Sequence, residues 1–148
     1  MSLSDWLSND WVVQHRSSAQ EIAQLLSVAD RALGDAQVPG LSPDGQPICP
    51  FDAALSCATA ALAACGYRVR QGPRHHQPTV QSLELTTGAS PELLRRMDGL
   101  RRRRITVTYE RAGTAIAGEA CEFLKLAKQL RQHVERWLRT NHPELVSP

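Results

Sequence analysis

The sequence of 148 residues has few aromatic side chains and no long apolar run. Only 5% of its residues are Phe, Trp or Tyr, although 42% are hydrophobic. A membrane-spanning helix needs about 20 mostly apolar residues in a row, so we expect no membrane span. The first residues lack the basic start and apolar stretch of a secretory signal, and we therefore expect a cytoplasmic protein.

The four cysteines form no pattern typical of a disulfide framework or a metal site. Cys57 and Cys65 lie eight residues apart on one expected helix, which separates their Cα atoms by about 12 Å. A disulfide requires a separation below roughly 7 Å. No spacing of Cys and His typical of zinc occurs. We therefore expect buried thiols, no metal and no cofactor.

The net positive charge is small, but arginines are concentrated in one place. The net charge is only +2, which excludes a uniformly basic nucleic-acid-binding domain. Six arginines nevertheless fall between positions 95 and 104. Any argument about phosphate binding therefore depends on this local patch.

Apolar residues recur every three or four positions along most of the chain, which predicts helices. Ser18 to Glu21 has the sequence of a capping box and opens a helix that continues through Ala36. Pro50 and Gly66 mark the ends of an alanine-rich helix. We expect this helix at the centre, because small side chains allow close approach from two sides. Further helices are expected at 78–87, from 91 through the arginines, and at about 115–141.

The remaining segments predict connections. Residues 1–17 are expected to form an N-terminal docking segment in which Trp6 and Trp11 contact the core. Residues 38–50 and 67–77 are rich in Pro, Gly or Arg and predict irregular loops. Residues 106–109 are β-branched, but a lone strand has no partner, so a frayed helix end is expected. The chain is thus predicted to be one all-α domain over 1–148, an up-and-down bundle of about five helices within 18–141.

Arg101, Arg102, Arg103 and Arg104 form an unbroken row at the end of one of these helices. The expected buried face of that helix carries Leu93, Leu94, Met97 and Leu100, and Arg104 continues the same series. A buried guanidinium is costly unless it meets an anion or a hydrogen-bonding partner. That partner is either a phosphate or an internal carboxylate, for which the candidates are Glu110, Glu119 and Glu122. Arg101 to Arg103 also suit a solvated basic face that complements the helix dipole.

Several features together resemble the HEPN superfamily of small helical domains. They are the segment from Leu100 to Glu110 (LRRRRITVTYE) at a helix end and the long final helix that follows it. The Ala-rich helix ending in Ala64-Cys-Gly-Tyr67, the downstream His75-His76 pair and the 38–43 loop support the likeness. The resemblance covers most of residues 18–140 and implies the helical bundle described above.

In HEPN members that cut RNA, an arginine binds the scissile phosphate and a histidine handles the proton of the 2′-hydroxyl, without metal. The resemblance places Arg104 on that arginine, Ile105 at the following position, which is usually polar, and Tyr109 where a histidine is expected. A phenol with a pKa near 10 is a poor base at neutral pH. We therefore predict binding of RNA or a nucleotide through an arginine-lined cleft, with weak or no catalysis.

Two other functions stay open. His75 or His76 could supply the missing imidazole, which would make the chain a metal-independent endoribonuclease toxin. The chain could instead be a noncatalytic partner of a nucleotidyltransferase or of an antitoxin. The resemblance also implies a homodimer. Candidate catalytic residues are Arg104, Tyr109 and His76, and candidate phosphate-binding residues are Arg101, Arg103, Arg104 and His75.

Overall fold

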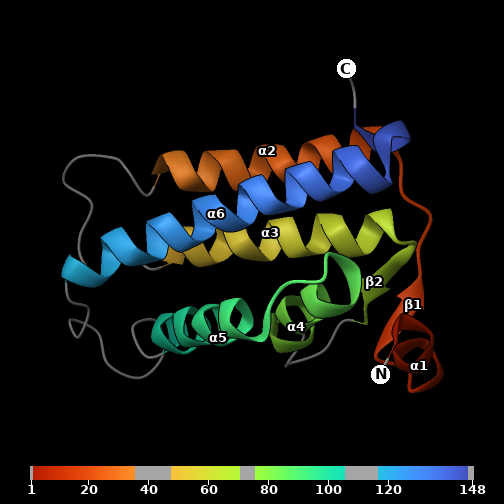
Figure 1. Cartoon of the computed structure of the whole chain (residues 1–148), viewed down its shortest axis with the longest axis horizontal. Coiled ribbons are helices and arrows are strands. Elements are labelled where there is room, and N and C mark those ends of the chain that lie inside the picture. Colours follow the sequence, from red (N-terminus) through yellow and green to blue (C-terminus); the bar gives the residue numbers. More distant parts are fainter. Residues whose placement is uncertain (1, 36–47, 71–75, 106–116, 147–148) are drawn as a thin grey trace.

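The computed structural model describes residues 2–35, 48–70, 76–105 and 117–146, and most of them are helical. The helices are α1 (Leu3–Ser8), α2 (Ala19–Asp35), α3 (Ile48–Ala64), α4 (His76–Thr86), α5 (Pro91–Ile105), α6 (Ala117–Asn141) and the 3₁₀ turn η2 (Pro143–Leu145). The chain reverses direction in the order α2, α3, α5, α6, with the short α4 before α5 (Figure 1). The predicted all-α bundle is confirmed. None of the described helices has the length and apolar character needed to span a membrane.

Helix α3 lies at the centre, with α2 and α6 on one side and α4 and α5 on the other (Figure 1). Six of its seven alanines are at most 2% exposed: Ala53, Ala54, Ala58, Ala60, Ala61 and Ala63. Because a methyl group occupies little space, neighbouring helices can approach α3 from both sides. Larger side chains then fill the gaps between the helices, among them Phe51, Leu83, Met97, Leu130 and Leu138. The central position predicted for this helix is confirmed.

The helix starts use hydroxyl groups as caps. The Ser90 hydroxyl accepts a hydrogen bond from the Leu93 N–H at 3.2 Å and caps the start of α5. The Ser18 hydroxyl accepts one from the Glu21 N–H at 3.1 Å. The Glu21 carboxylate, however, lies 2.7 Å from His15 Nε2. The carboxylate half of the predicted capping box therefore serves to hold the preceding segment against α2.

The helix ends fall close to the predicted positions. Gly66 and Gly88 follow α3 and α4 with φ of +93° and +71°, a conformation that glycine adopts without steric cost. Helix α3 begins two residues before Pro50, and α4 begins two residues before Pro78. Both starts are earlier than predicted, because proline is tolerated anywhere in a first turn, where the N–H has no helical partner.

A small sheet corrects the sequence analysis. Strand β1 (Val12–Gln14) pairs antiparallel with β2 (Tyr67–Val69), so residues 67–69 are not the irregular connection that was expected. The sheet brings the N-terminal segment to the end of α3, where Trp6, Val12 and Leu62 form a second small core. The predicted docking of Trp6 is confirmed, because it is 6% exposed.

The predicted docking of Trp11 is wrong, because this side chain is 46% exposed. Its ring meets Trp6 edge to face, with centroids 5.7 Å apart and an interplanar angle of 75°. Asp10, just before it, has a φ of 60°, so the chain turns sharply between α1 and β1. That turn directs the Trp11 ring away from the core.

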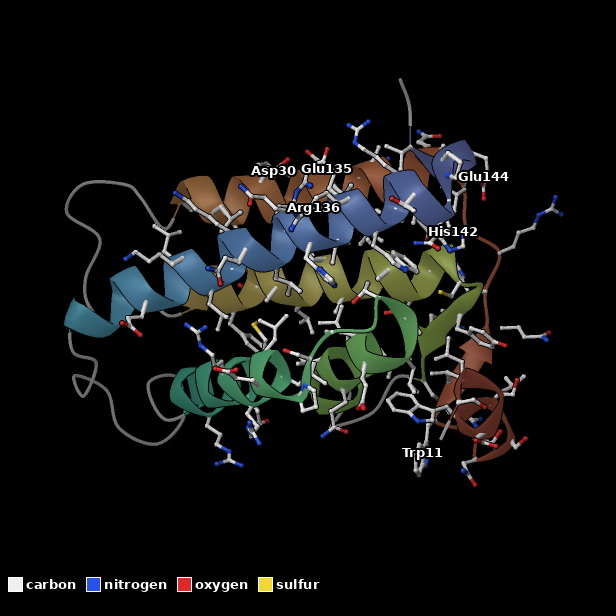
Figure 2. All side chains as sticks on the ribbon, in the orientation of Figure 1. Trp11, Asp30, Glu135, Arg136, His142 and Glu144 are labelled. Carbon is white, nitrogen blue, oxygen red and sulfur yellow. The ribbon has the colours of Figure 1, made fainter. Side chains whose placement is uncertain are left out.

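An ionic network joins α2 to α6. Arg131 donates from Nε to Asp30 Oδ1 at 3.0 Å and from Nη2 to Asp30 Oδ2 at 3.2 Å, and its Nη1 lies 3.0 Å from Glu135 Oε2. Figure 2 shows Asp30 and Glu135 close together across the two helices. Burial acts to lower the pKa of Arg131, but the hydrogen bond and charge of Asp30 outweigh it and raise the pKa. The guanidinium therefore stays charged and fixes the register of α6 on α2.

Candidate functional site

The arginine row is helical. Helix α5 continues through Ile105, so Arg101 to Arg104 occupy its last turn, as predicted. Met97, seven residues before Arg104, is fully buried, and Leu94 packs partly buried against the main core. The side chains of Arg101, Arg103 and Arg104 lie outside the part of the chain whose side chains are described. The inward direction predicted for Arg104 therefore stays a prediction.

The other predicted site residues lie at the edge of the described ranges or outside them. Tyr109 and His75 lie outside the described residues. His76 is the first residue of α4, and its side chain is also outside the described set. Helix α4 packs against α5, so the backbone of His76 belongs to a helix next to the arginine helix. An approach of its imidazole to Arg104 stays a prediction.

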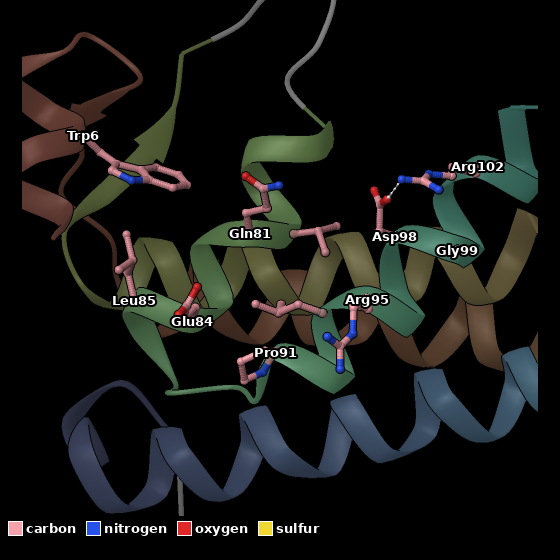
Figure 3. Close-up of a pocket in the computed structure, with 11 residues that line it drawn as sticks. Trp6, Gln81, Glu84, Leu85, Pro91, Arg95, Asp98, Gly99 and Arg102 are labelled. Carbon is pink, nitrogen blue, oxygen red and sulfur yellow. Dashed lines mark ion pairs between the residues drawn. The ribbon is translucent and has the colours of Figure 1, made fainter. Parts of the chain in front are cut away.

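A groove of about 750 Å³ lies where α1, α4 and α5 meet. Its apolar wall consists of Trp6, Val80, Leu85, Pro91 and Leu94. Trp6 and Leu85 lie at one end and Arg102 lies at the other (Figure 3). The groove therefore extends from the small core at the N-terminus to the arginine-rich end of α5. A ligand that lies along it would touch both.

The polar wall of the groove is mostly one face of α5. Arg95, Asp98 and Arg102 follow a spacing of three and four residues, which places them on the same side of the helix. Arg102 Nη2 lies 2.9 Å from Asp98 Oδ2, so this carboxylate holds the guanidinium along the groove. Arg95 forms no ion pair with any residue in the described ranges. Its charge is available to an anionic ligand.

The described lining carries no net charge, because Arg95 and Arg102 are balanced by Glu84 and Asp98. The surplus of positive charge comes from the arginines that follow Arg102 and from the exposed Arg96. An anionic ligand is therefore attracted to the second half of α5, and the Trp6 end of the groove is neutral to acidic. This difference in charge favours one orientation of an anionic ligand along the groove.

The groove contains residues that sequence reasoning did not select, namely Trp6, Gln81, Glu84 and Arg95. Arg95 belongs to the basic patch, and the periodicity of α5 would have placed it on one face with Arg102. Nothing local connects Trp6 with Gln81, which is 75 residues away in the sequence. Only the docking of the N-terminal segment brings them together.

A second hollow of about 420 Å³ is lined by His15, Cys65 and Tyr67, among others. Burial raises the pKa of the Cys65 thiol, so this cysteine is a weak nucleophile at neutral pH. Cys57 and Cys65 are both free. Within the described ranges, no three His, Cys, Asp or Glu side chains are arranged to hold a metal ion. The groove beside α5 is therefore the better candidate site.

No family model matches this sequence, and no curated protein matches it. The HEPN resemblance consequently stays a hypothesis. The function has to be argued from the chemistry of the groove.

Proposed function

We propose that this chain is a cytoplasmic, HEPN-type helical domain that binds RNA or a nucleotide through the groove and the arginine-rich end of α5. The observation that carries the proposal is Arg95, a groove-wall cation with no ion-pair partner among the described side chains, on one helix face with the Asp98-held Arg102. A guanidinium binds phosphate through two parallel N–H groups. Arg101, Arg103 and Arg104 extend the same positive region.

The spacing of the arginines favours a ligand with more than one phosphate. Arg95 and Arg102 are seven residues apart, which corresponds to about 10.5 Å along a helix. At that separation the two side chains can contact different phosphates of one strand. A short stretch of RNA therefore uses the groove better than a mononucleotide.

We favour a binding role with weak or no catalysis over an enzymatic one. The described lining of the groove contains no histidine, and its Asp98 is engaged by Arg102. The described lining therefore lacks the imidazole that most often serves as general base at neutral pH. The resemblance implies a homodimer, and we propose that two copies pair.

The alternative is an endoribonuclease, in which Arg104, Tyr109 and either His75 or His76 would take part. The apolar wall of the groove would also suit a protein partner such as a nucleotidyltransferase or an antitoxin.

The binding proposal is tested by fluorescence anisotropy with a labelled single-stranded RNA of about 12 nucleotides at roughly 50 and 200 mM salt. Arg95→Gln and Arg102→Gln should each weaken binding by about 1.4 kcal/mol, roughly tenfold in Kd. Each should also lower the slope of log K against log salt by about 0.7. Arg31→Gln is the matched control, because Arg31 is exposed on α2, in the opposite layer.

Two outcomes contradict the proposal. One is the absence of binding at the lower salt concentration, and the other is an equal loss of affinity in Arg31→Gln. The nuclease alternative is tested by incubating RNA with the protein in EDTA and analysing the fragment ends. Fragments with 2′,3′-cyclic phosphate that disappear in Arg104→Ala and His76→Ala would establish catalysis and refute the purely binding role.

A further inference from the structure

The groove differs in character at its two ends. At one end, Arg95 and Arg102 offer guanidiniums. At the other, Trp6 forms the wall, and the Trp11 ring stands against it at 5.7 Å with 46% of its surface exposed. Figure 2 shows Trp11 pointing outward at the edge of the molecule. Trp11 does not itself line the groove, but it lies against Trp6, which does. Its exposed indole gains from stacking on a flat ligand that extends past the Trp6 end of the groove.

Two polar side chains lie between these ends. Gln81 and Glu84 are three residues apart on α4, and both are exposed on the groove wall. In Figure 3 they lie between Trp6 and Arg95. Neither has a hydrogen-bond partner among the described residues. An ionised carboxylate only accepts hydrogen bonds, whereas an amide both donates and accepts.

We propose that the tryptophan end of the groove is a base-recognition site for single-stranded RNA that favours cytosine over uracil. This inference rests on the proposed function, in which the arginines hold the phosphates. A base stacks on an exposed aromatic side chain and presents its edge to neighbouring polar groups. The Glu84 carboxylate accepts from the N4 amino group of cytosine. Uracil has a carbonyl oxygen at that position, which the carboxylate repels.

The test compares labelled oligocytidine and oligouridine of about eight nucleotides, two pyrimidines that differ in their hydrogen-bonding edges. The full chain should bind oligocytidine on the order of tenfold more tightly, since one good base contact contributes about that factor. Glu84→Gln should bring the ratio near one, because an amide can also donate to the uracil carbonyl. Asp35→Asn is the matched control on the exposed end of α2 and should keep the wild-type ratio.

The stacking role is tested separately. Trp11→Ala should weaken binding of both oligomers on the order of tenfold, the usual effect of removing one stacked aromatic. Trp11→Phe should restore most of that loss, because a phenyl ring still stacks. RNA should also quench the tryptophan fluorescence of the wild type more strongly than that of Trp11→Ala. Trp11 and Glu84 are both exposed, so these variants should fold, as circular dichroism would verify.

Failure of the inference is distinguishable from failure of the proposed function. Equal affinity of the wild type for the two oligomers, or wild-type affinity in Trp11→Ala, overturns base recognition. If Arg95→Gln still weakens binding in that case, the phosphate-binding function stands. If neither oligomer binds at low salt, the proposed function is refuted and the inference with it.

Discussion

Enlarging one alanine of α3 should reveal how tightly the two layers close on this helix. Ala58 is fully buried, and α3 is confined by α2 and α6 on one side and by α4 and α5 on the other. Ala58→Leu adds three carbon atoms, which would gain about 0.8 kcal/mol each if there were room for them. In a close-packed site the added atoms instead force the backbone or side chains to shift, at a cost of about 1–3 kcal/mol.

We expect the upper part of that range, about 3 kcal/mol, because α3 cannot move away from one layer without pressing on the other. For a domain of this size the loss corresponds to a fall in Tm of about 6–12 °C. Urea denaturation followed by circular dichroism should show a lower midpoint with an unchanged m-value.

The control is Ala23→Leu on α2, where the side chain is exposed and the two residues have similar helix propensity. It should unfold within about 0.5 kcal/mol of the wild type. A wild-type or higher midpoint for Ala58→Leu would refute the reasoning, because it would mean that the layers leave free space around α3.

Three further predictions concern ionic contacts, backbone freedom and thiol chemistry. In urea titrations, Arg131→Met should lower the free energy of unfolding by about 1 kcal/mol. Asp30→Asn should lower it little further in that background, because Asp30 and Arg131 form one ion pair. Gly34→Ala should raise it by about 0.5–1 kcal/mol, since this helical glycine has no atom within 4 Å of an added Cβ; an unchanged Tm would contradict this. Burial raises the pKa of Cys57 from 9.0 to about 12, so the folded protein should not react at this thiol with a disulfide reagent near pH 8. As the pH rises, the thiol of the unfolded chain loses its proton before that of the folded protein. The contribution of the Cys57 thiol to stability is therefore complete below pH 9 and is lost as the pH rises towards about 12. Cys57→Ala should lack that pH dependence.

Much of the helical framework could be predicted because its signals are local. Serine caps, a first-turn proline and a following glycine all act within a few residues, and they located the ends of α3 and α5 to within two residues. The alanine content of α3 likewise indicated a helix packed on more than one side. The two strands were missed because each has only three residues and its partner is more than 50 residues away. So short a segment has no usable alternation of polar and apolar residues.

The site was predicted only in part. The arginine row and its position on a helix could be identified from the sequence, and so could the buried face that includes Met97. The opposite wall of the groove could not, because Gln81 and Glu84 face Arg95 only through the packing of α4 on α5. The exposure of Trp11 was also missed, since a tryptophan in an aromatic-poor chain is usually buried.

The amino-acid sequence by itself determined which segments are helical, which helix lies at the centre and where the positive charge gathers. These properties depend on side-chain size, charge and contacts within one or two turns. The tertiary structure alone decided that Trp6, with Trp11 against it, stands at one end of a groove whose other end carries Arg102. That arrangement depends on pairing β1 with β2 and on packing α4 against α5, which join residues with no local relation to one another.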